Sequence, residues 1–478
     1  MSKFETRLFV NGEFMEAEHA ETFSLSNPAT GETVAEIPIA GEVDIDNAVK
    51  AAERAQPAWS RVPARRRAAI IRKFAALMDQ NKHKLSELDS ICMGKPLHGG
   101  LEDIQEAVDI SNYFAGLVEI AGGETSLNSP EVLSISMRQP YGVVASIIPW
   151  NFPSMIWCHD VVPAAGAGNA VILKTSEKSP LSGIFLAKLA FEAGFPAGII
   201  NVVSGPGSTG ALLSSHMKIR RISFTRSTGA GRAIMQAAAK SNLKAVSLEL
   251  GGKSPLIVFD DADLEKTAAA AVGSITINSG QICTASSRLY VQKGVSETFK
   301  LKLKQKMEAL KLGNPLQSGT EMGPQADKKQ AEAIAKFLEI GNQEGVALTG
   351  GKPAKDKGDN FIQPTVFTGL SDSSRLNIDE IFGPVLVLHE FETEEEVIRR
   401  ANATEYGLYA SVFSKNIDTA LRVARALEAG NVGVNTTSPF GAYELAFGGF
   451  KGSGVGRQKG SRSVLDWTEE KSVYINHE

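Results

Sequence analysis

The sequence predicts an α/β fold built on parallel sheets, and two observations support this. Short apolar runs rich in valine and isoleucine alternate with longer segments of helical period. Uniformly apolar strands of this kind belong to sheets that helices cover on both faces. The chain has 478 residues, of which 43% are hydrophobic and 22% are charged. This is ordinary globular composition, and at about 100–200 residues per domain it allows roughly two to four domains.

A first alternating stretch lies between residues 142 and 248. Its expected strands are Gly142–Ile148, Ala170–Leu173, Ile199–Val203, Arg221–Phe224 and Ala245–Leu248, and its expected helices are Ser154–Ala165, Leu181–Ala193, Gly210–Ser215 and Gly229–Lys240. We expect Ser179 to cap the second of these helices and Pro180 to begin it, because serine is a preferred N-cap and proline suits the first helical position.

A second alternating stretch follows between residues 255 and 435. Its expected strands are Pro255–Phe259, Leu289–Gln292, Val385–His389, Tyr409–Phe413 and Val432–Asn435, and its expected helices are Leu264–Asn278, Glu297–Leu312, Lys328–Gly341, Glu394–Ala401 and Thr419–Ala429. The pattern does not decide whether this stretch forms a second α/β layer or extends the first sheet.

Three segments outside the alternating strands and helices also have readable patterns. Ala68–Leu88 carries its apolar residues on one helical face, which predicts a single amphipathic helix. The basic triplet Arg65–Arg67 that precedes this face is expected to be solvated. Lys352–Asn360 is rich in glycine, lysine and aspartate, which predicts an exposed loop.

The charge balance excludes two classes of partner. Lysine and arginine number 50 against 54 aspartate and glutamate, so the formal net charge is −4. Proteins that bind nucleic acid or anionic membranes need a large basic surplus to neutralise phosphates. We therefore expect neither nucleic acid nor a membrane among the partners of this chain.

The three cysteines and the hydropathy pattern predict a cytoplasmic protein. Cys92, Cys158 and Cys283 are too few for a disulfide framework in a chain of this length, which favours a reducing compartment. The first ten residues lack the apolar region of a signal peptide. The longest weakly polar run, Val161–Leu173, is far shorter than the roughly 20 residues that a membrane span needs.

A glycine-rich turn follows the expected strand Ile199–Val203. Residues Gly205–Gly210 fit the G-x-G-x-x-G pattern of dinucleotide sites, between a strand and a possible helix. The second position of this turn, Pro206, lacks the N–H group that a phosphate loop uses. A cofactor loop and a tight strand-to-helix turn both remain open for this motif.

Polar residues follow three of the expected strands, at the sheet edge where ligands bind in open α/β folds. Lys174 and Glu177 follow one strand, and Glu249 and Lys253 bracket two glycines after another. Asn151 follows a third strand and lies between prolines and aromatic residues, so its amide would be held rigidly. Taken singly, the charged pairs also fit surface ion pairs, and the asparagine also fits a rigid turn.

Cys283 differs from the other two cysteines in its surroundings. It lies in a polar, glycine-containing turn after the expected helix Leu264–Asn278, where a side chain can face a cleft. Cys92 and Cys158 lie in helix-like segments and fit the inert, buried class of cysteine. A nucleophilic thiol needs a nearby base or a field that favours the thiolate.

Taken together and in this order, these motifs resemble those of the aldehyde dehydrogenase superfamily, of the NAD(P)-dependent, non-phosphorylating kind. The motifs span residues 149–454, and Phe9–Gly12 and Asn27–Gly31 resemble the family's entry hairpin, so the resemblance covers essentially the whole chain. The matching segments are Pro149–Pro153, Lys174–Glu177, Phe224-Thr225 with Ser227, Glu249–Lys253, Gly280–Cys283, Glu380–Pro384 and Phe447–Gly454.

The resemblance implies an aldehyde dehydrogenase-like α/β fold with a Rossmann-type cofactor domain, an α/β catalytic domain and a small β oligomerisation element. These would comprise residues 1–116 with 138–249, residues 250–448, and residues 117–137 with 461–478, respectively. The β-like stretch Ser472–Ile475 would then pair with a sheet edge of another subunit. We therefore expect a homo-oligomer, either a dimer or a homotetramer.

The resemblance also assigns roles to single residues. Cys283 would be the nucleophile and Glu249 the general base, and Asn151 would share the oxyanion with the backbone N–H of Cys283. The residues implied to hold NAD are Ile147, Pro149, Trp150, Lys174, Glu177, Gly207, Phe224, Thr225, Ser227, Leu250, Glu380 and Phe382. In this family the glycine turn does not cradle the pyrophosphate in the usual way, which weakens the standard reading of residues 205–210.

The implied chemistry is the oxidation of an aldehyde to a carboxylic acid. Thiolate attack on the carbonyl gives a tetrahedral oxyanion, hydride leaves to the nicotinamide, and a thioester of Cys283 remains. Glu249 would then remove a proton from the water that hydrolyses this thioester. We expect no metal, because the sequence has no histidine and cysteine cluster with metal-ligand spacing.

Three positions depart from the family pattern. Arg226 stands where the family usually has glycine, and contact with the pyrophosphate or with a 2′-phosphate would leave NADP open beside NAD. Glu177 favours NAD, because a carboxylate near the 2′-position repels a phosphate. Gln458 and Asn314 replace a glutamate and an aspartate of the family, and we assign these two changes no functional role.

The residues expected to line the substrate tunnel are mostly apolar, and none is arginine or lysine. They are Phe152, Met155, Ile156, His159, Ile277, Ile282, Thr284 and Phe447. A carboxylated semialdehyde would need a guanidinium partner, so we expect an uncharged aliphatic, terpenoid or aromatic aldehyde. Asp160 and Glu444, if they lie near the tunnel mouth, keep a cationic aminoaldehyde open.

Three other functions compete with hydrolytic aldehyde oxidation. A CoA-acylating dehydrogenase shares the thioester but does not need a carboxylate base at Glu249. A catalytically silent NAD-binding protein would not need Asn151, Glu249 and Cys283 together. A thiol hydrolase would pair Cys283 with a histidine, and only His159 lies near a motif, which would leave the cofactor motifs without a role.

Overall fold

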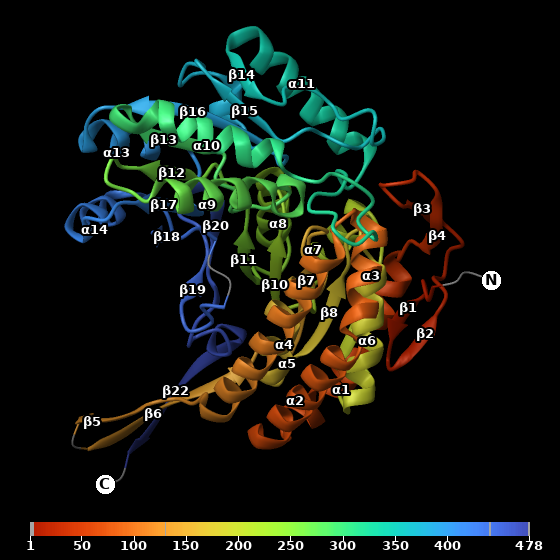
Figure 1. Cartoon of the computed structure of the whole chain (residues 1–478). Helices are drawn as coiled ribbons and strands as arrows, with labels where there is room; N and C mark the ends of the chain where they lie inside the picture. The colour runs from red at the N-terminus through yellow and green to blue at the C-terminus, as the bar shows by residue number, and fades with distance from the viewer. Residues whose placement is uncertain (1–3, 130, 439–440, 477–478) are drawn as a thin grey trace.

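The computed structural model describes residues 4–129, 131–438 and 441–476. These residues form two α/β units, each built on its own sheet, and a smaller three-stranded sheet that extends away from them (Figure 1). The expected α/β class is confirmed. None of the helices in the described ranges is long and apolar enough to cross a membrane.

The first sheet has eight strands in the order β2-β1-β9-β8-β7-β10-β11-β20. Strands β9, β8, β7, β10 and β11 run parallel, and this is the 3-2-1-4-5 order of a Rossmann-type domain. In such sheets ligands bind beyond the carboxyl ends of the strands where the order reverses, here between β7 and β10. The strands are β1 (Leu8–Val10), β2 (Glu13–Met15), β7 (Val143–Ile147), β8 (Ala170–Lys174), β9 (Ile200–Val203), β10 (Arg221–Thr225), β11 (Ala245–Glu249) and β20 (Gly454–Val455).

Helices surround this sheet, and α4 packs across α2, α3 and α5. The helices are α1 (Glu42–Trp59), α2 (Ala64–Gln80), α3 (Lys82–Met93), α4 (Leu97–Ile120), α5 (Pro153–Gly166), α6 (Leu181–Ala193), α7 (Gly207–Ser215) and α8 (Thr228–Lys240). The prediction of a single helix over Ala68–Leu88 is wrong, because the helix is interrupted at Asn81, between α2 and α3. The Asn81 side chain donates to the carbonyl of Leu77 at 2.8 Å, a local bond that competes with helix continuation.

Two smaller expectations in this region also need correction. Arg65 and Arg66 are exposed, but Arg67 is half-buried and its Nε donates to the carbonyl of Gly166 at 2.8 Å. Burial lowers the pKa of Arg67, so the basic triplet is only partly a solvated face. Ser179 does not cap α6: its hydroxyl donates to the carbonyl of Trp150 at 3.1 Å instead.

The second alternating stretch forms a sheet of its own, in the order β14-β15-β16-β13-β12-β17-β18. Neighbouring strands run parallel except for β14 and β15. The strands are β12 (Pro255–Val258), β13 (Arg288–Gln292), β14 (Val346–Thr349), β15 (Thr365–Thr368), β16 (Val385–Phe391), β17 (Tyr409–Phe413) and β18 (Asn431–Val434). The helices are α9 (Leu264–Thr276), α10 (Ser296–Glu308), α11 (Lys328–Glu344), α12 (Arg375–Ile378), α13 (Glu394–Asn402) and α14 (Ile417–Ala426).

Both faces of this second sheet are covered, as uniformly apolar strands predict. Leu256 of β12 joins a buried cluster with Ile275 of α9 and Phe299 of α10. The next residue, Ile257, points to the other face and joins a cluster with Val397 of α13. The core therefore continues through the sheet, and helices close it on either side (Figure 1).

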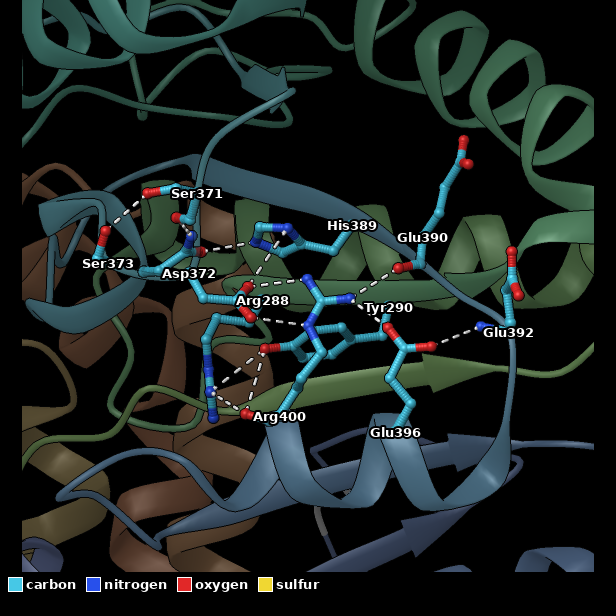
Figure 2. A network of polar contacts seen from close by, with 11 residues as sticks. Arg288, Tyr290, Ser371, Asp372, Ser373, His389, Glu390, Glu392, Glu396 and Arg400 are labelled. Carbon is cyan, nitrogen blue, oxygen red and sulfur yellow. Dashed lines mark hydrogen bonds and ion pairs between the residues drawn. The ribbon is translucent and has the colours of Figure 1, made fainter.

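A buried polar network ties the start of β13 to the segments around it (Figure 2). Arg288 donates through Nε to the carbonyl of Lys253 and through Nη2 to that of Ala401, both at 2.8 Å. Beside it the ring of Tyr290 stacks on His389, with centroids 5.5 Å apart. The guanidinium therefore fixes the chain just before β12, close to the connection between the two large sheets.

The third sheet joins two segments far apart in the sequence, in the order β22-β6-β5. Its strands are β5 (Thr125–Ser129), β6 (Val132–Pro140) and β22 (Thr468–Asn476), and together they form the projecting arm of Figure 1. Ser472–Ile475 pairs with Leu133–Ser136 of the same chain. The oligomerisation role of this sheet, and the domain limits given above, stay predictions.

The remaining short elements complete the chain. Two further strand pairs are β3 (Thr22–Ser26) with β4 (Thr33–Pro38), and β19 (Ala446–Phe447) with β21 (Gln458–Lys459). The 3₁₀ turns are η1 (Ile277–Gly280), η2 (Lys293–Val295), η3 (Lys451–Ser453) and η4 (Leu465–Trp467). Among these, η1 and the β19-β21 pair bear directly on the site described next.

Candidate active site

A cavity of about 810 Å³ lies at the carboxyl ends of β7, β10 and β11. Residues after β7, at the end of β10 and at the end of β11 line it from the first sheet, and Cys283, Glu380 and Phe382 line it from the second unit. This is the position that the order of the first sheet predicts for a ligand. The cavity therefore lies between the two α/β units.

The cavity receives Cys283 from a strained turn. Asn278, Ser279 and Gly280 have φ values of 49°, 58° and 76°, and left-handed backbone is costly for the first two residues. Buried hydrogen bonds hold this turn: Asn278 Nδ2 donates to the carbonyl of Asn151 at 3.0 Å, and Ser279 Oγ donates to that of Gly323 at 2.8 Å. Such strain persists only where the surroundings impose it, and it is frequent at functional sites.

Glu249, the last residue of β11, lines the cavity together with Cys283, and the two side chains interact electrostatically. Burial raises the pKa of Glu249 to about 8, and the charges of Glu380 and Asp160 act in the same direction. Burial and the neighbouring carboxylates raise the pKa of Cys283 as well. The Oε1 atom of Glu249 is buried and has no hydrogen-bond partner among the described residues. The pair thus joins a thiol to an unusually basic carboxylate.

Asn151 follows β7 and is buried beside the cysteine turn. Its Nδ2 donates to the carbonyl of Gln281 at 2.9 Å. The amide of Asn278 returns a bond to the backbone of Asn151. These reciprocal bonds fix the Asn151 amide within the segment that carries Cys283.

The two glycines after Glu249 allow a close approach. A Cβ on Gly251 would lie 2.2 Å from Oε2 of Glu380, and a Cβ on Gly252 would lie 2.4 Å from the carbonyl oxygen of Cys283. Gly252 donates its N–H to Oε1 of Glu380 at 3.1 Å. Burial raises the pKa of Glu380 to about 7, opposed by this N–H and by the charge of Lys253. Larger residues would push Glu380 and the cysteine segment away from this turn.

Ser453 holds the same connection from the other side. Its carbonyl accepts the N–H of Leu250 at 2.9 Å, and its hydroxyl donates to the carbonyl of Gly251 at 2.7 Å. The hydroxyl also accepts the N–H of Gly407 at 2.9 Å. Ser453 is fully buried, so one side chain and its backbone link both units to the segment after Glu249.

The other end of the cavity carries Glu177 and Arg226. Arg226 Nη2 donates to Oε1 of Glu177 at 2.7 Å, and Nη1 lies 3.4 Å from Oε2. Lys174 is buried close behind and donates to the carbonyl of Thr175 at 3.0 Å. Burial lowers the pKa of Lys174 to about 8. The sequence suggested a possible ion pair within residues 174–177, but Glu177 is paired with Arg226.

The expected ion pair between Glu249 and Lys253 is likewise not formed. The buried Lys253 Nζ has no hydrogen-bond partner among the described residues, and burial lowers the pKa of Lys253 to about 7. The rings of Trp150 and Phe382, which both line the cavity, meet edge to face with centroids 5.5 Å apart.

Most, but not all, of the expected cofactor residues line the cavity. The lining includes Pro149, Trp150, Glu177, Thr225, Ser227, Glu380 and Phe382. Ile147, Phe224 and Leu250 are buried in the layer beneath it, and Lys174 lies behind Glu177. Gly207 begins α7 and is exposed.

The glycine motif before α7 has a packing role. A Cβ on Gly205 would lie 2.1 Å from Oγ1 of Thr209, and this hydroxyl donates to the carbonyl of Ala40 at 2.8 Å. Pro206 occupies the N-cap position of α7. The turn therefore has the geometry of a tight strand-to-helix connection, and a cofactor contact by Gly207 stays a prediction.

All but one of the expected substrate residues line the Cys283 end of the cavity. They are Phe152, Met155, Ile156, His159, Ile282, Thr284 and Phe447. Ile277 lies outside the cavity and is 37% exposed, because it precedes the left-handed turn that redirects the chain. Burial lowers the pKa of His159 well below its ordinary value, which keeps this ring uncharged.

Neither Asp160 nor Glu444 is part of the cavity lining. Asp160 is buried and accepts from Ser146 Oγ at 2.5 Å and from Gln458 Nε2 at 3.0 Å. Glu444 is exposed and lines a separate hollow. Asp160 points away because α5 turns its side chain toward the strands, not toward the cavity.

Sequence reasoning missed more than ten residues that line the cavity, and Gln458 and Lys459 are two of them. Gln458 contributes its side chain there, although we had assigned it no role. Lys459 also lines it, and its Nζ is paired with Oε1 of Glu106 at 3.0 Å. Both residues arrive on β21, a two-residue strand whose position depends on the returning C-terminal segment. No local sequence pattern predicts that these two residues reach the cavity. The only indication was that Gln458 replaces a glutamate that is common in the family.

The cavity suits a dinucleotide. Glu177 and Glu380 at separate points of the lining can accept hydrogen bonds from ribose hydroxyls, and Ser227 leads into the N-terminus of α8, where backbone N–H groups favour phosphates. The fit rests on these two carboxylate acceptors, on the N–H donors at the start of α8 and on the close approach that Gly251 permits. Among the described residues, no group of three or more His, Cys, Asp or Glu side chains is placed to hold a metal ion.

Known proteins are similar to this chain over nearly its whole length. The model of the aldehyde dehydrogenase family matches residues 14–473. An aldehyde dehydrogenase of Emericella nidulans is 43% identical over 470 residues, which cover 98% of this chain and 94% of that protein. The structure of a P. syringae indole-3-acetaldehyde dehydrogenase mutant with NAD+ and IAA has a TM-score of 0.97 at 38% identity, covering 99% of this chain and 97% of that one. An E. coli NADP dependent enzyme has a TM-score of 0.96 at 37% identity, with 99% and 98% covered.

Proposed function

The chain belongs to the aldehyde dehydrogenase family, and on this premise we propose that it oxidises an uncharged, largely apolar aldehyde to the carboxylic acid through a thioester of Cys283. It is an NAD-dependent aldehyde dehydrogenase, and NADP-dependent enzymes also occur among the similar structures. The observation that carries the proposal is the interaction of the Cys283 thiol with the buried carboxylate of Glu249 in the same cavity, beside the fixed amide of Asn151.

The first step is activation of the thiol. Glu249 accepts the proton of Cys283, because its pKa of about 8 makes it far more basic than an ordinary carboxylate. The thiolate sulfur then bonds to the carbonyl carbon of the aldehyde, and the negative charge moves to the carbonyl oxygen. The product is a tetrahedral adduct on Cys283.

The oxyanion of this adduct needs donors that are already oriented. The Asn151 amide and the backbone N–H of Cys283 are the groups we assign to it. Asn151 is suited to the role because its hydrogen bond to Gln281 prevents rotation of the amide. In comparable sites one such donor stabilises the transition state by about 2.7–4 kcal/mol.

Glu177, Glu380 and the lining residues between them would hold the dinucleotide. When bound, it supplies the acceptor for the hydride that the adduct loses. The aromatic pair Trp150 and Phe382 forms part of the lining. These side chains orient the cofactor and exclude water until the adduct has collapsed to the thioester.

Hydrolysis requires Glu249 a second time. After it has released the first proton to solvent, the carboxylate takes a proton from water, whose oxygen bonds to the thioester carbon. The carbon–sulfur bond then breaks, and the Cys283 thiolate recovers a proton. The unpartnered Oε1 of Glu249 is the acceptor that supports this role.

The lining near Cys283 supports an uncharged substrate. Lys459 introduces a positive charge that the sequence did not predict, but it forms an ion pair with the buried Glu106 at 3.0 Å. His159 is uncharged. Asp160 and Glu444 do not face the cavity, so no observation favours an aminoaldehyde.

A comparison of three substrates tests this part of the proposal. The value of kcat/KM should be highest for a medium-chain aldehyde and lower for a carboxylated semialdehyde and for an aminoaldehyde. A preference for either charged aldehyde by more than about tenfold would contradict the assignment. NADH should form without CoA, because Glu249 supplies the base for hydrolysis.

A cysteine variant tests the reaction itself. Cys283→Ala should form no NADH from any aldehyde while still binding NAD, because the thiol takes part in bond formation only. Cys92→Ala is the matched control, since this thiol is buried in α3 and does not line the cavity. Turnover by Cys283→Ala close to that of the unchanged enzyme would reject the proposed function.

We also propose that the arm formed by β5, β6 and β22 joins subunits into a dimer or tetramer. The outer edge of β22 offers backbone groups that another strand can pair with. Light scattering should give a mass of two or four chains, and a monomer at micromolar concentration would contradict this. A cytoplasmic location belongs to the same proposal, and fractionation with a compartment marker tests it.

A further inference from the structure

We propose that Arg226 sets the coenzyme preference of this enzyme: by pairing with Glu177, it allows a dinucleotide with a 2′-phosphate to bind as well as NAD. The inference rests on the proposed function, because it assumes that this end of the cavity holds the adenosine ribose. It concerns a residue that departs from the family pattern, where glycine is usual.

The pair is placed where a cofactor can reach it. Glu177 and Arg226 both line the cavity, and their side chains are 28% and 34% exposed. Arg226 follows the last residue of β10, and Ser227 then leads into α8. The guanidinium therefore lies at the strand end where the sheet order reverses and where dinucleotides bind.

The pair changes the charge that a ribose would meet. Burial opposes ionisation of Glu177, but the charge and hydrogen bonds of Arg226 outweigh it, so the pKa of Glu177 is lowered. Lys174 interacts electrostatically with both groups. With two cations and one carboxylate, the cluster has a net positive charge. With glycine at this position, Glu177 would face only Lys174 and would repel a phosphate more strongly.

The geometry suits both coenzymes. Only one of the two Glu177 oxygens has a short bond to Arg226, at 2.7 Å, and the other lies 3.4 Å from the guanidinium. The second oxygen can accept a ribose hydroxyl of NAD while the ion pair stays intact. For NADP, the guanidinium can turn from the carboxylate to the 2′-phosphate, which it binds through two parallel hydrogen bonds.

A purely structural ion pair would have no such effect, and coenzyme binding separates the two cases. Isothermal titration calorimetry of the cofactor-free protein with NAD+ and with NADP+ gives both dissociation constants without turnover. In the unchanged protein we expect the two constants to differ by less than about tenfold. A value for NADP+ that is more than about a hundredfold weaker would contradict the proposal.

The main variant is Arg226→Gln, which removes the charge but keeps a side chain of similar reach. It should weaken NADP+ binding by about tenfold or more and change NAD+ binding by less than about threefold. Arg226→Lys should weaken NADP+ binding less, because it keeps the charge but loses the paired hydrogen bonds. Glu177→Gln should strengthen NADP+ binding, because it removes the repulsion.

Arg220→Gln is the matched control, because Arg220 forms an exposed ion pair with Glu469 outside the cavity. Both constants should stay unchanged in this variant. If Arg226→Gln leaves the ratio of the two constants unchanged while both coenzymes still bind, the inference about Arg226 is rejected and the proposed function stands. If neither coenzyme binds to the unchanged protein, the cofactor site itself is wrongly assigned.

Discussion

Glu249 and Cys283 line the same cavity and interact electrostatically although they come from different units of the fold. Glu249 ends β11 of the first sheet, and Cys283 follows η1, which leads out of α9 in the second unit. The site is therefore assembled only when both units fold and pack together. This relationship gives the first of four predictions.

Turnover should depend on the ionisation of Glu249. The carboxylate acts as a base only when it is ionised, and burial raises its pKa to about 8. Under saturating substrate, kcat should therefore rise about tenfold per pH unit below this value and level off above it. A pH–rate profile between pH 4 and 10 measures this. Glu249→Gln should lose this limb of the profile, and a limb centred near pH 4.5 in the unchanged enzyme would contradict the assignment.

Replacement of Asn151 should affect the chemical step and spare coenzyme binding. Asn151→Ala removes the proposed oxyanion donor, and kcat should fall by about 10²–10³-fold. The dissociation constant of NAD+ should change little, because the Asn151 side chain bonds to the carbonyl of Gln281. Stopped-flow kinetics and calorimetry give the two values. Equal losses in kcat and in NAD+ affinity would indicate a collapsed cavity instead.

A carboxylate at position 458, common in the family, should destabilise this chain. The amide of Gln458 donates to Asp160 at 3.0 Å, and burial already raises the pKa of Asp160. Gln458→Glu would lose this donor and place two buried carboxyls together, at a cost of about 1–3 kcal/mol at pH 8.

The sign of the pH effect follows from the raised pKa values. A proton shared by the two carboxyls restores the hydrogen bond at low pH, so the loss in unfolding free energy should be smaller at pH 5 than at pH 8. Urea unfolding at fixed protein concentration measures both values. A loss that does not depend on pH would show that Asp160 and position 458 do not interact.

Two glycines near Cys283 should respond to alanine in opposite ways. Gly280 has φ of 76°, and a Cβ there would lie 2.1 Å from the carbonyl carbon of Gly383. Gly280→Ala should lower the melting temperature and abolish activity, because the turn that holds Cys283 cannot keep its shape. Gly273 lies in α9 with no atom within 4 Å of an added Cβ, and Gly273→Ala should stabilise by about 0.5–1 kcal/mol. Equal effects of the two changes would contradict this reading.

Local patterns predicted much of the fold. The apolar runs identified the parallel strands of the first sheet, since burial on both faces leaves a signal in each strand alone. The break at Asn81 was missed because the apolar face continues on both sides of it, and periodicity does not record a side chain that bonds to its own backbone. The sequence also could not predict that the second alternating stretch forms a separate sheet, because strand pairing depends on residues far apart in the chain.

The residues of the site were likewise predicted only in part. Asn151 and Glu249 were predicted as site residues because they follow strand ends, and Cys283 because it lies in a polar turn after a helix. The family pattern fixes the order of the three. The partner of Glu177 lies 49 residues away at Arg226, and Lys459 meets Glu106 from the other end of the chain. No local pattern reports such pairs, because only the folded backbone brings these side chains together.

The hydrogen bonds of Ser453 to the segment after Glu249 limit how far the two α/β units can move relative to each other. Leu250 and Gly251 connect the two units and would be the hinge residues of any opening and closing motion between them. Their backbone is tied to Ser453, and Arg288 fixes the chain again at Lys253. A pivot at this connection would break several buried bonds at once, so the halves should move as one rigid body. Coenzyme would then enter and leave through rearrangement of side chains along the rim, and crystals with and without it should superpose without rotation of one half against the other.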